Sequence, residues 1–355
     1  MRGHRLALGW MLALAGGAPL HAQSAPAAAS TVNAVDLPTV SVSGVQPGPG
    51  LWKISRGGHV MWVLGLVPAM PAQVQWRSDD VAAAIAGSQE LLEPPHAEFE
   101  VKAGFFAKLF LLPSAYAARK NEDGRRLQEV LPAPLYQRWL ALKARFIGHD
   151  NGIERWRPMF AAMELEKRAR NAYGLTGDAG VRKAVDALAE QHGVPRIHAD
   201  YKVVIEHPRD ALKAFRKAGP QDVECFARTL DSVEHDLPAM SARADAWAVG
   251  DVEALRGMPD SQARDACVQA LSAAGFARQL GMADVPAKVV ATWVAAAREA
   301  LITHQQTFAL LPIDELLRPG PYLQALRADG DTIEAPDDAG PEAGEASPAK
   351  PASGG

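Results

Sequence analysis

The fold is decided by residues 51–68, which read LWKISRGGHVMWVLGLVP. Apolar and polar side chains alternate over residues 51–55, two glycines occupy the centre of residues 56–59, and residues 60–64 are all apolar. Alternation, a two-glycine turn and a second, wholly apolar run are typical of a β-hairpin. The wholly apolar run also indicates that the second strand is covered on both faces.

The rest of the foldable chain alternates between helical and extended patterns. Apolar residues at helical spacing predict helices at 79–86, 181–189, 223–237, 252–255, 284–301 and 322–328. Short apolar runs between them predict strands at 90–92, 194–197, 308–313 and 332–334. This order predicts an α/β fold with a mixed β-sheet flanked by helices. Residues 102–170 are expected to form a helical cap insertion.

The first 22 residues have the pattern of a secretory signal peptide. Arg2 and Arg5 precede an apolar run at 6–14, and a small-residue cleavage site ends at Ala22. The alternative is a membrane anchor, but the apolar run is too short to cross a hydrocarbon core of roughly 30 Å. We therefore expect cleavage near Ala22, a periplasmic location, and no membrane insertion of the mature chain.

Charge and composition limit the partners and the folded region. The formal net charge is −4, and it becomes −6 without residues 1–22, which contain two arginines and no acidic residue. Such a chain gains nothing from binding phosphate backbones, so nucleic acid is excluded as an expected partner. Residues 23–47 and 335–355 are poor in large apolar side chains and are expected to be a disordered linker and tail. Residues 48–334 remain as one α/β domain.

The chain contains two cysteines, Cys225 and Cys267. Each lies in a helical pattern, and an oxidising compartment favours a disulfide between them. Closing a loop of about 40 residues would stabilise the fold by roughly 3 to 4 kcal/mol. The alternative is two unrelated buried thiols.

Several catalytic motifs are absent from the sequence. There is no G-x-S-x-G nucleophile elbow, H-E-x-x-H helix, G-x-x-x-x-G-K-[ST] loop or C-x-x-C pair. His192, His198 and His207 come nearest to a histidine cluster, but their spacing fits neither one helix face nor a strand. Scattered histidines on the surface are the simpler interpretation.

Several blocks, in this order, carry a resemblance to a known family: residues 51–54, 63–71, 76–78, 246–255 and 326–330. The chain resembles the TraB/GumN family, which is related to the Tiki metalloproteases. The resemblance extends over nearly the whole foldable chain. It implies a metal-dependent hydrolase fold with a site at two separated motifs.

The resemblance implies a divalent metal held by two G-x-x-H motifs with acidic residues beside them. The first motif reads Gly65-Leu66-Val67-Pro68 and the second Pro312-Ile313-Asp314-Glu315. Proline and glutamate therefore stand at the two histidine positions, and the second glycine is also replaced. Glu93 is the one expected metal-binding residue that remains.

A catalytic metal needs about three protein ligands, and losing two imidazoles removes the preference for a transition metal. We therefore predict no cofactor and no catalytic residues. The expected role is a binding or scaffold protein for an unknown protein or peptide. The alternative is a metal-dependent hydrolase or protease with a rearranged carboxylate site. In that case Glu93, Glu315 and Asp314 would hold Mg²⁺ or Ca²⁺, or His198 would join Glu315.

Overall fold

The computed structural model describes residues 48–71, 75–102, 104, 111–114, 116–177, 179–216, 220–258, 277 and 282–338. The predicted signal peptide, the predicted linker and most of the predicted tail lie outside the described residues, as does Cys267. Within the described part of the chain, no helix is long and apolar enough to cross a membrane.

A six-stranded mixed sheet forms the centre of the fold, in the order β10-β1-β2-β9-β4-β7. Strands β2, β9, β4 and β7 are parallel, whereas β1 is antiparallel to both β2 and β10. The predicted fold class is therefore confirmed. The strands are β1 (Leu51–Arg56), β2 (His59–Leu66), β4 (Leu91–Leu92), β7 (Arg196–Ile197), β9 (Gln306–Pro312) and β10 (Thr332–Glu334).

The hairpin of β1 and β2 forms as its sequence predicts. Gly57 and Gly58 have φ angles of 55° and 94°, a left-handed pair that matches the twist of a two-residue hairpin. The turn sets the register, with Trp52 opposite Val63. Val63 is fully buried, in agreement with a second strand covered on both faces.

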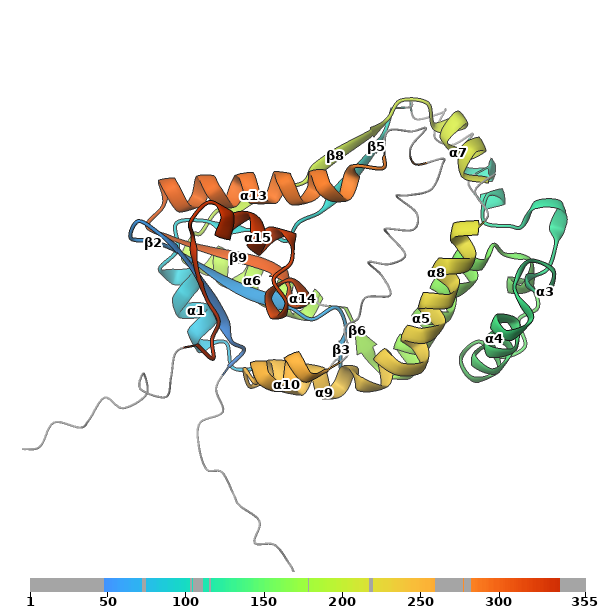
Figure 1. The fold of residues 1–355 in the computed structure, drawn as a ribbon, viewed down its shortest axis with the longest axis horizontal. Helices are drawn as coiled ribbons and strands as arrows, with labels where there is room; N and C mark the ends of the chain where they lie inside the picture. The colour runs from blue at the N-terminus through green and yellow to red at the C-terminus, as the bar shows by residue number, and fades with distance from the viewer. Residues whose placement is uncertain are drawn as a thin grey trace, which may run out of the picture. The chain divides into compact units, whose positions relative to one another are not determined.

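Helices cover the sheet on both sides. Helix α13 (Val285–Thr303) contacts β1, β2, β9 and α15 (Pro321–Ala328). On the other side, α1 (Asp79–Ala86) packs against β9 and against α6 (Ala179–His192). Figure 1 shows α13 and α1 on opposite sides of β2 and β9. The predicted apolar face of α13 is largely buried, including Trp293 and Ala297.

A second hydrophobic cluster forms mainly among helices, together with Ala69 and Leu175. Trp139, Leu165 and Phe226 are at its centre, and all three are fully buried. The cluster uses the predicted helical insertion together with later helices. Its elements are α3 (Leu127–Val130), α4 (Ala133–Phe146), η2 (Ile153–Arg155), α5 (Pro158–Ala172), α8 (Pro220–Asp231), the π-helical turn η3 (Ser232–Asp236) and the start of α9 (Leu237–Ala248).

Helix α9 takes part in both clusters. Met240 packs in the helical cluster, whereas Ala244 and Trp247 pack in the cluster around the sheet. The helix predicted at 223–237 is thus α8 and η3, with α9 continuing from Leu237. Cys225 lies on α8 and is 1% exposed. Because Cys267 lies outside the described residues, the pairing of the two cysteines stays a prediction.

Two short two-stranded sheets were not predicted. Strand β5 (Ala97–Val101) pairs in parallel with β8 (Tyr201–Ile205), and β3 (Met70–Pro71) pairs with β6 (Leu175–Thr176). Strand β5 follows β4 and strand β8 follows β7, so they lie beyond the same end of the main sheet. The remaining elements are η1 (Glu122–Gly124), α7 (Pro208–Arg216), α10 (Val252–Gly257) and α14 (Ile313–Leu317).

A buried ion pair joins α5 and α8 of the helical cluster, and its arginine also contacts α7. Arg157, which precedes α5, donates two hydrogen bonds to Asp222 of α8, with N···O distances of 2.6 and 2.9 Å. Both side chains are at most 5% exposed. Arg157 also donates to the carbonyl of Phe215 in α7, at 2.7 Å. Burial raises the pKa of the Asp222 carboxyl, and Arg157 opposes that rise.

We predict that Arg157→Leu or Asp222→Leu alone lowers the free energy of unfolding by about 3 to 5 kcal/mol, because each leaves a buried charge without its partner. The double variant should lose less than the sum of the two, since it leaves no buried charge. Urea denaturation at neutral pH measures all three. Arg168→Leu, which breaks an exposed pair on α5 with Glu164, is the matched control and should cost under about 1 kcal/mol. A strictly additive double variant would contradict the interpretation.

Candidate functional site

Both motif segments lie at one edge of the main sheet. Strands β2 and β9 are parallel neighbours with Leu66 opposite Pro312, so the residues after each strand emerge side by side. Glu93 follows β4 and His198 follows β7, which are also parallel to β9. Since the carboxyl ends of parallel strands meet at one edge, the structure brings the sequence-predicted positions to the same edge.

Gly65 is retained from the first motif for a packing reason. A Cβ atom at Gly65 would lie 2.3 Å from the Cδ1 atom of Ile313 and 3.1 Å from its Cα atom. Helix α14 therefore packs directly against the backbone of β2. The carbonyl of Gly65 also accepts a hydrogen bond of 2.6 Å from the indole nitrogen of Trp247, which joins α9 to this edge.

The two prolines have backbone roles and provide no coordinating side-chain atom. Pro68 is half-buried in the turn after β2. Pro312 ends β9 and occupies the N-cap position of α14, with φ −56° and ψ 136°. Its fixed φ angle suits the change from strand to helix. The segment that could hold a ligand in the second motif thus begins a short helix.

Glu93 is buried and lies close to two arginines. Its side chain is 3% exposed, and its oxygens lie 3.4 Å from Nη2 of Arg182 and 3.7 Å from Nη1 of Arg196. Arg196 also forms an ion pair with Asp186 at 3.0 Å, and the Asp186 carboxylate raises the pKa of Arg196. The Glu93 carbonyl accepts a hydrogen bond of 3.0 Å from the indole of Trp293. The backbone of Glu93 is therefore held by a hydrogen bond, and the negative charge of its side chain is compensated by two arginines.

Asp314 and Glu315 interact with other parts of the chain. Asp314 pairs with Arg243 of α9, whose side chain is only 2% exposed. The half-buried Glu315 packs on Gly320, where an added Cβ atom would lie 1.7 Å from its Oε2 atom. Gly320 is the N-cap residue of α15, so the Glu315 carboxylate lies at the start of that helix, a favourable place for a negative charge.

These residues do not make the donor set that a metal needs. Over the described ranges, no group of three or more His, Cys, Asp or Glu side chains is placed to hold a metal ion. Glu93, Asp314 and Glu315 share one edge of the sheet, but none of the contacts described above joins one of them to another. His198 is exposed and forms no part of such a group. The residues present therefore do not fit the divalent metal that the motifs imply.

The sequence did not indicate the three arginines of this edge. Arg182 lies between apolar positions of α6, Arg196 precedes the last residue of β7, and Arg243 lies inside α9. A buried arginine such as Arg243 has no distinguishing local pattern, because its burial depends on Asp314 from a distant segment. A charged side chain within the two-residue strand β7 was the one local pattern that could have pointed to Arg196.

The fold and the sheet edge define a class of α/β protein with its motif residues at the carboxyl ends of parallel strands. The TraB/PrgY/gumN family is matched over residues 50–335, which is most of the chain, and the chain belongs to that family. No curated protein and no solved structure matches the chain.

We predict that Gly65→Ala lowers the free energy of unfolding by about 1 to 3 kcal/mol, because the new methyl group overpacks the contact with Ile313. Adding Ile313→Val removes the nearest clashing atom, Cδ1, and should recover part of the loss. The control is Gly180→Ala on α6, where a Cβ atom meets nothing within 4 Å. Thermal or urea unfolding provides the measurement. An unchanged stability of Gly65→Ala would show that α14 does not need the close approach.

Proposed function

We propose that this chain is an exported, periplasmic member of the TraB/PrgY/gumN family that lacks metal-dependent hydrolase activity. It acts as a binding or scaffold protein for a protein or peptide partner. The main support is the chemistry of the sheet edge, where Pro68 offers no donor atom, Glu93 lies beside two arginines, and Glu315 packs at the start of α15.

The surroundings of Glu93 are the single observation that carries the proposal. Two guanidinium groups, from Arg182 and Arg196, lie beside its carboxylate. A divalent cation bound to the same oxygens would be repelled by both, and the burial of Glu93 limits screening of that repulsion by solvent. The arginines thus supply the positive charge that a metal ion would otherwise supply to this carboxylate.

The replaced motif positions add independent support. Pro68 offers no donor atom, and Glu315 lies against the start of α15. One remaining acidic ligand cannot offset the dehydration of a transition-metal ion, which ordinarily needs about three protein ligands. The hydrolase alternative would require Glu93, Asp314 and Glu315 to converge, and the present contacts of all three count against it.

The proposed export rests on the N-terminal sequence. Residues 1–22 have a basic start, an apolar run and a small-residue cleavage site. The two cysteines are consistent with an oxidising compartment, in which Cys225 and Cys267 would pair. We therefore include periplasmic folding with a disulfide in the proposal.

We predict that the purified protein carries far less than one Mn, Co or Zn per chain by elemental analysis, even after incubation with each metal and desalting. The matched comparison is Pro68→His with Glu315→His and Arg182→Gln, which restores two imidazoles and removes one repelling cation. That variant should retain more Zn²⁺ than the parent chain, since it adds two imidazoles at the sheet edge that carries Glu93. A stoichiometric, tightly held transition metal in the unaltered chain would contradict the proposal.

We predict that the full-length chain, produced in a Gram-negative host, is recovered from the periplasmic fraction with its N-terminus just after Ala22. Thiol titration of the denatured, unreduced protein should detect no thiol, because Cys225 and Cys267 are oxidised there. Reduction should lower the melting temperature. A Cys225→Ser, Cys267→Ser variant is the control and should not respond to reductant. Two titratable thiols, or retention in the cytoplasm, would argue against export with pairing.

A further inference from the structure

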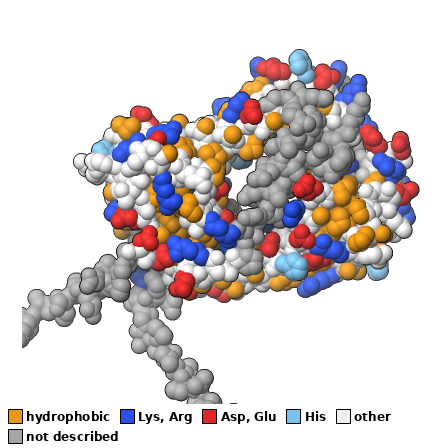
Figure 2. Space-filling view, viewed as in Figure 1, with side chains coloured by type: hydrophobic (Ala, Val, Ile, Leu, Met, Phe, Trp, Pro, Cys, Tyr) orange, Lys and Arg blue, Asp and Glu red, His pale blue; other side chains and the backbone are white. Residues whose placement is uncertain are grey.

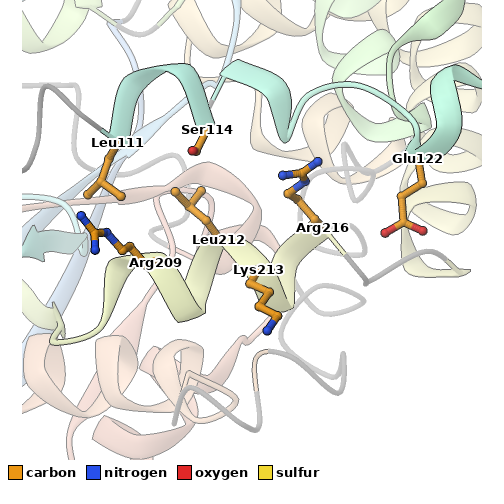
Figure 3. Close-up of a pocket in the computed structure, with 7 residues that line it drawn as sticks. All are labelled: Leu111, Ser114, Glu122, Arg209, Leu212, Lys213 and Arg216. Atoms are coloured by element: carbon orange, nitrogen blue, oxygen red, sulfur yellow. The ribbon is translucent and has the colours of Figure 1, made fainter.

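A cavity of about 410 Å³ lies in the helical part of the molecule, away from the sheet edge. Its wall is formed by α7, by the segment 111–114 and by Glu122 of η1. Figure 3 shows Arg209, Leu212 and Arg216 pointing from α7 toward the segment that carries Leu111 and Ser114. A volume of this size is in the range of pockets that hold small organic molecules.

Three cations of α7 line the cavity: Arg209, Lys213 and Arg216. Their spacing of four and three residues puts them on one side of the helix. On the face shown in Figure 2, basic and acidic side chains are interspersed, whereas this wall sets three cations against the single carboxylate of Glu122. The cavity therefore carries an excess of positive charge.

Within the described part of the chain, these three cations lack the carboxylate partners that several arginines have. Arg138, Arg157 and Arg298 each form ion pairs with aspartate or glutamate at 3.1 Å or less. Among the described residues, no hydrogen bond or ion pair joins Arg209, Lys213 or Arg216 to an acidic group. Their charge remains available to a ligand.

Helix stability does not account for this arrangement. Lys213 and Arg216 lie in the last turn of α7, where a cation is favourable, but Arg209 lies in the first turn, where a cation opposes the helix dipole. Arg209 and Lys213 are also like charges four residues apart, which destabilises a helix. An anion bound between them would relieve both effects.

Helix α7 is anchored to the helical cluster through Phe215. The guanidinium carbon of Arg157 lies 4.3 Å from the centre of the Phe215 ring, and Arg157 also donates to the Phe215 carbonyl. Phe160 makes an edge-on contact with the same ring at 6.0 Å. Because Arg157 is fixed by its buried pair with Asp222, the cationic side of α7 is held in a defined position.

The rest of the wall suits a ligand that is not purely ionic. Leu111 and Leu212 provide an apolar surface, and the hydroxyl of Ser114 can donate or accept a hydrogen bond. Guanidinium groups bind phosphate oxygens in a bidentate manner, and a dianion benefits from two of them. The wall thus combines a place for a phosphate group with a place for an apolar body.

We propose that this cavity binds a small phosphate-bearing organic molecule, with Arg209 and Arg216 on the phosphate and Leu111 and Leu212 against its apolar part. The proposal goes beyond the function proposed for the sheet edge and uses none of that edge's residues. It makes the helical part of the molecule a ligand-binding region in its own right.

The test is calorimetry of the full mature chain with phenyl phosphate. Arg209→Gln with Arg216→Gln should weaken binding roughly tenfold or more, since two charge-assisted contacts are lost. The control is Arg168→Gln with Arg170→Gln on α5, which makes the same change in net charge and should leave binding unchanged. Circular dichroism of each variant establishes that the fold is retained. Absence of binding to the parent chain, or equal weakening by the control pair, would overturn the proposal.

Two further arms identify the ligand class. Leu212→Ala should weaken binding of phenyl phosphate and leave binding of inorganic phosphate unchanged, because only the former uses the apolar wall. Vesicles containing an anionic phospholipid distinguish a lipid headgroup from a free small molecule. Binding of the parent chain to such vesicles, without binding to phenyl phosphate, would refute the small-molecule assignment. Equal loss of both phosphate ligands in Leu212→Ala would refute the role given to the apolar wall.

Discussion

The parallel pairing of β2 with β9 is the contact on which the rest of the structure depends. It joins segments from opposite ends of the domain and brings the residues after both strands to one edge. Helix α14 can follow β9 immediately because Gly65 leaves no side chain between β2 and Ile313. The hydrogen bond from Trp247 to the Gly65 carbonyl then positions α9, the helix that links the two hydrophobic clusters.

Charge compensation by arginine is a feature that Glu93 and Asp314 share at this edge. Arg182 and Arg196 lie beside Glu93, and Arg243 pairs with Asp314. A family site built for a cation needs carboxylates with free oxygens. Here Glu93 and Asp314 lie beside arginines, and Glu315 packs on Gly320. This is why a fold assignment alone does not transfer an activity to the chain.

The helical part has its own polar organisation. The buried pair of Arg157 and Asp222 fixes α5 and α8, and through Phe215 it also holds α7. The cations on the outer side of α7 are consequently presented from a fixed support. Among the described residues, the arginines of the sheet edge lie beside carboxylates, whereas no ion pair joins Arg209, Lys213 or Arg216 of the cavity wall to an acidic group.

The sequence by itself determined the hairpin, the α/β class, several of the helices and the replacement of the two histidines, because these follow from local periodicity, turn glycines and residue identity. It also placed Glu93 at a strand end. Only the tertiary structure decided the partners of Glu93 and Asp314, the packing of Glu315 on Gly320 and the pairing of β5 with β8. Those features join segments that are distant in the chain. No local sequence pattern predicts which distant side chain will lie against a given residue. The burial of Arg243 is the clearest case, since a carboxylate from another element offsets its cost.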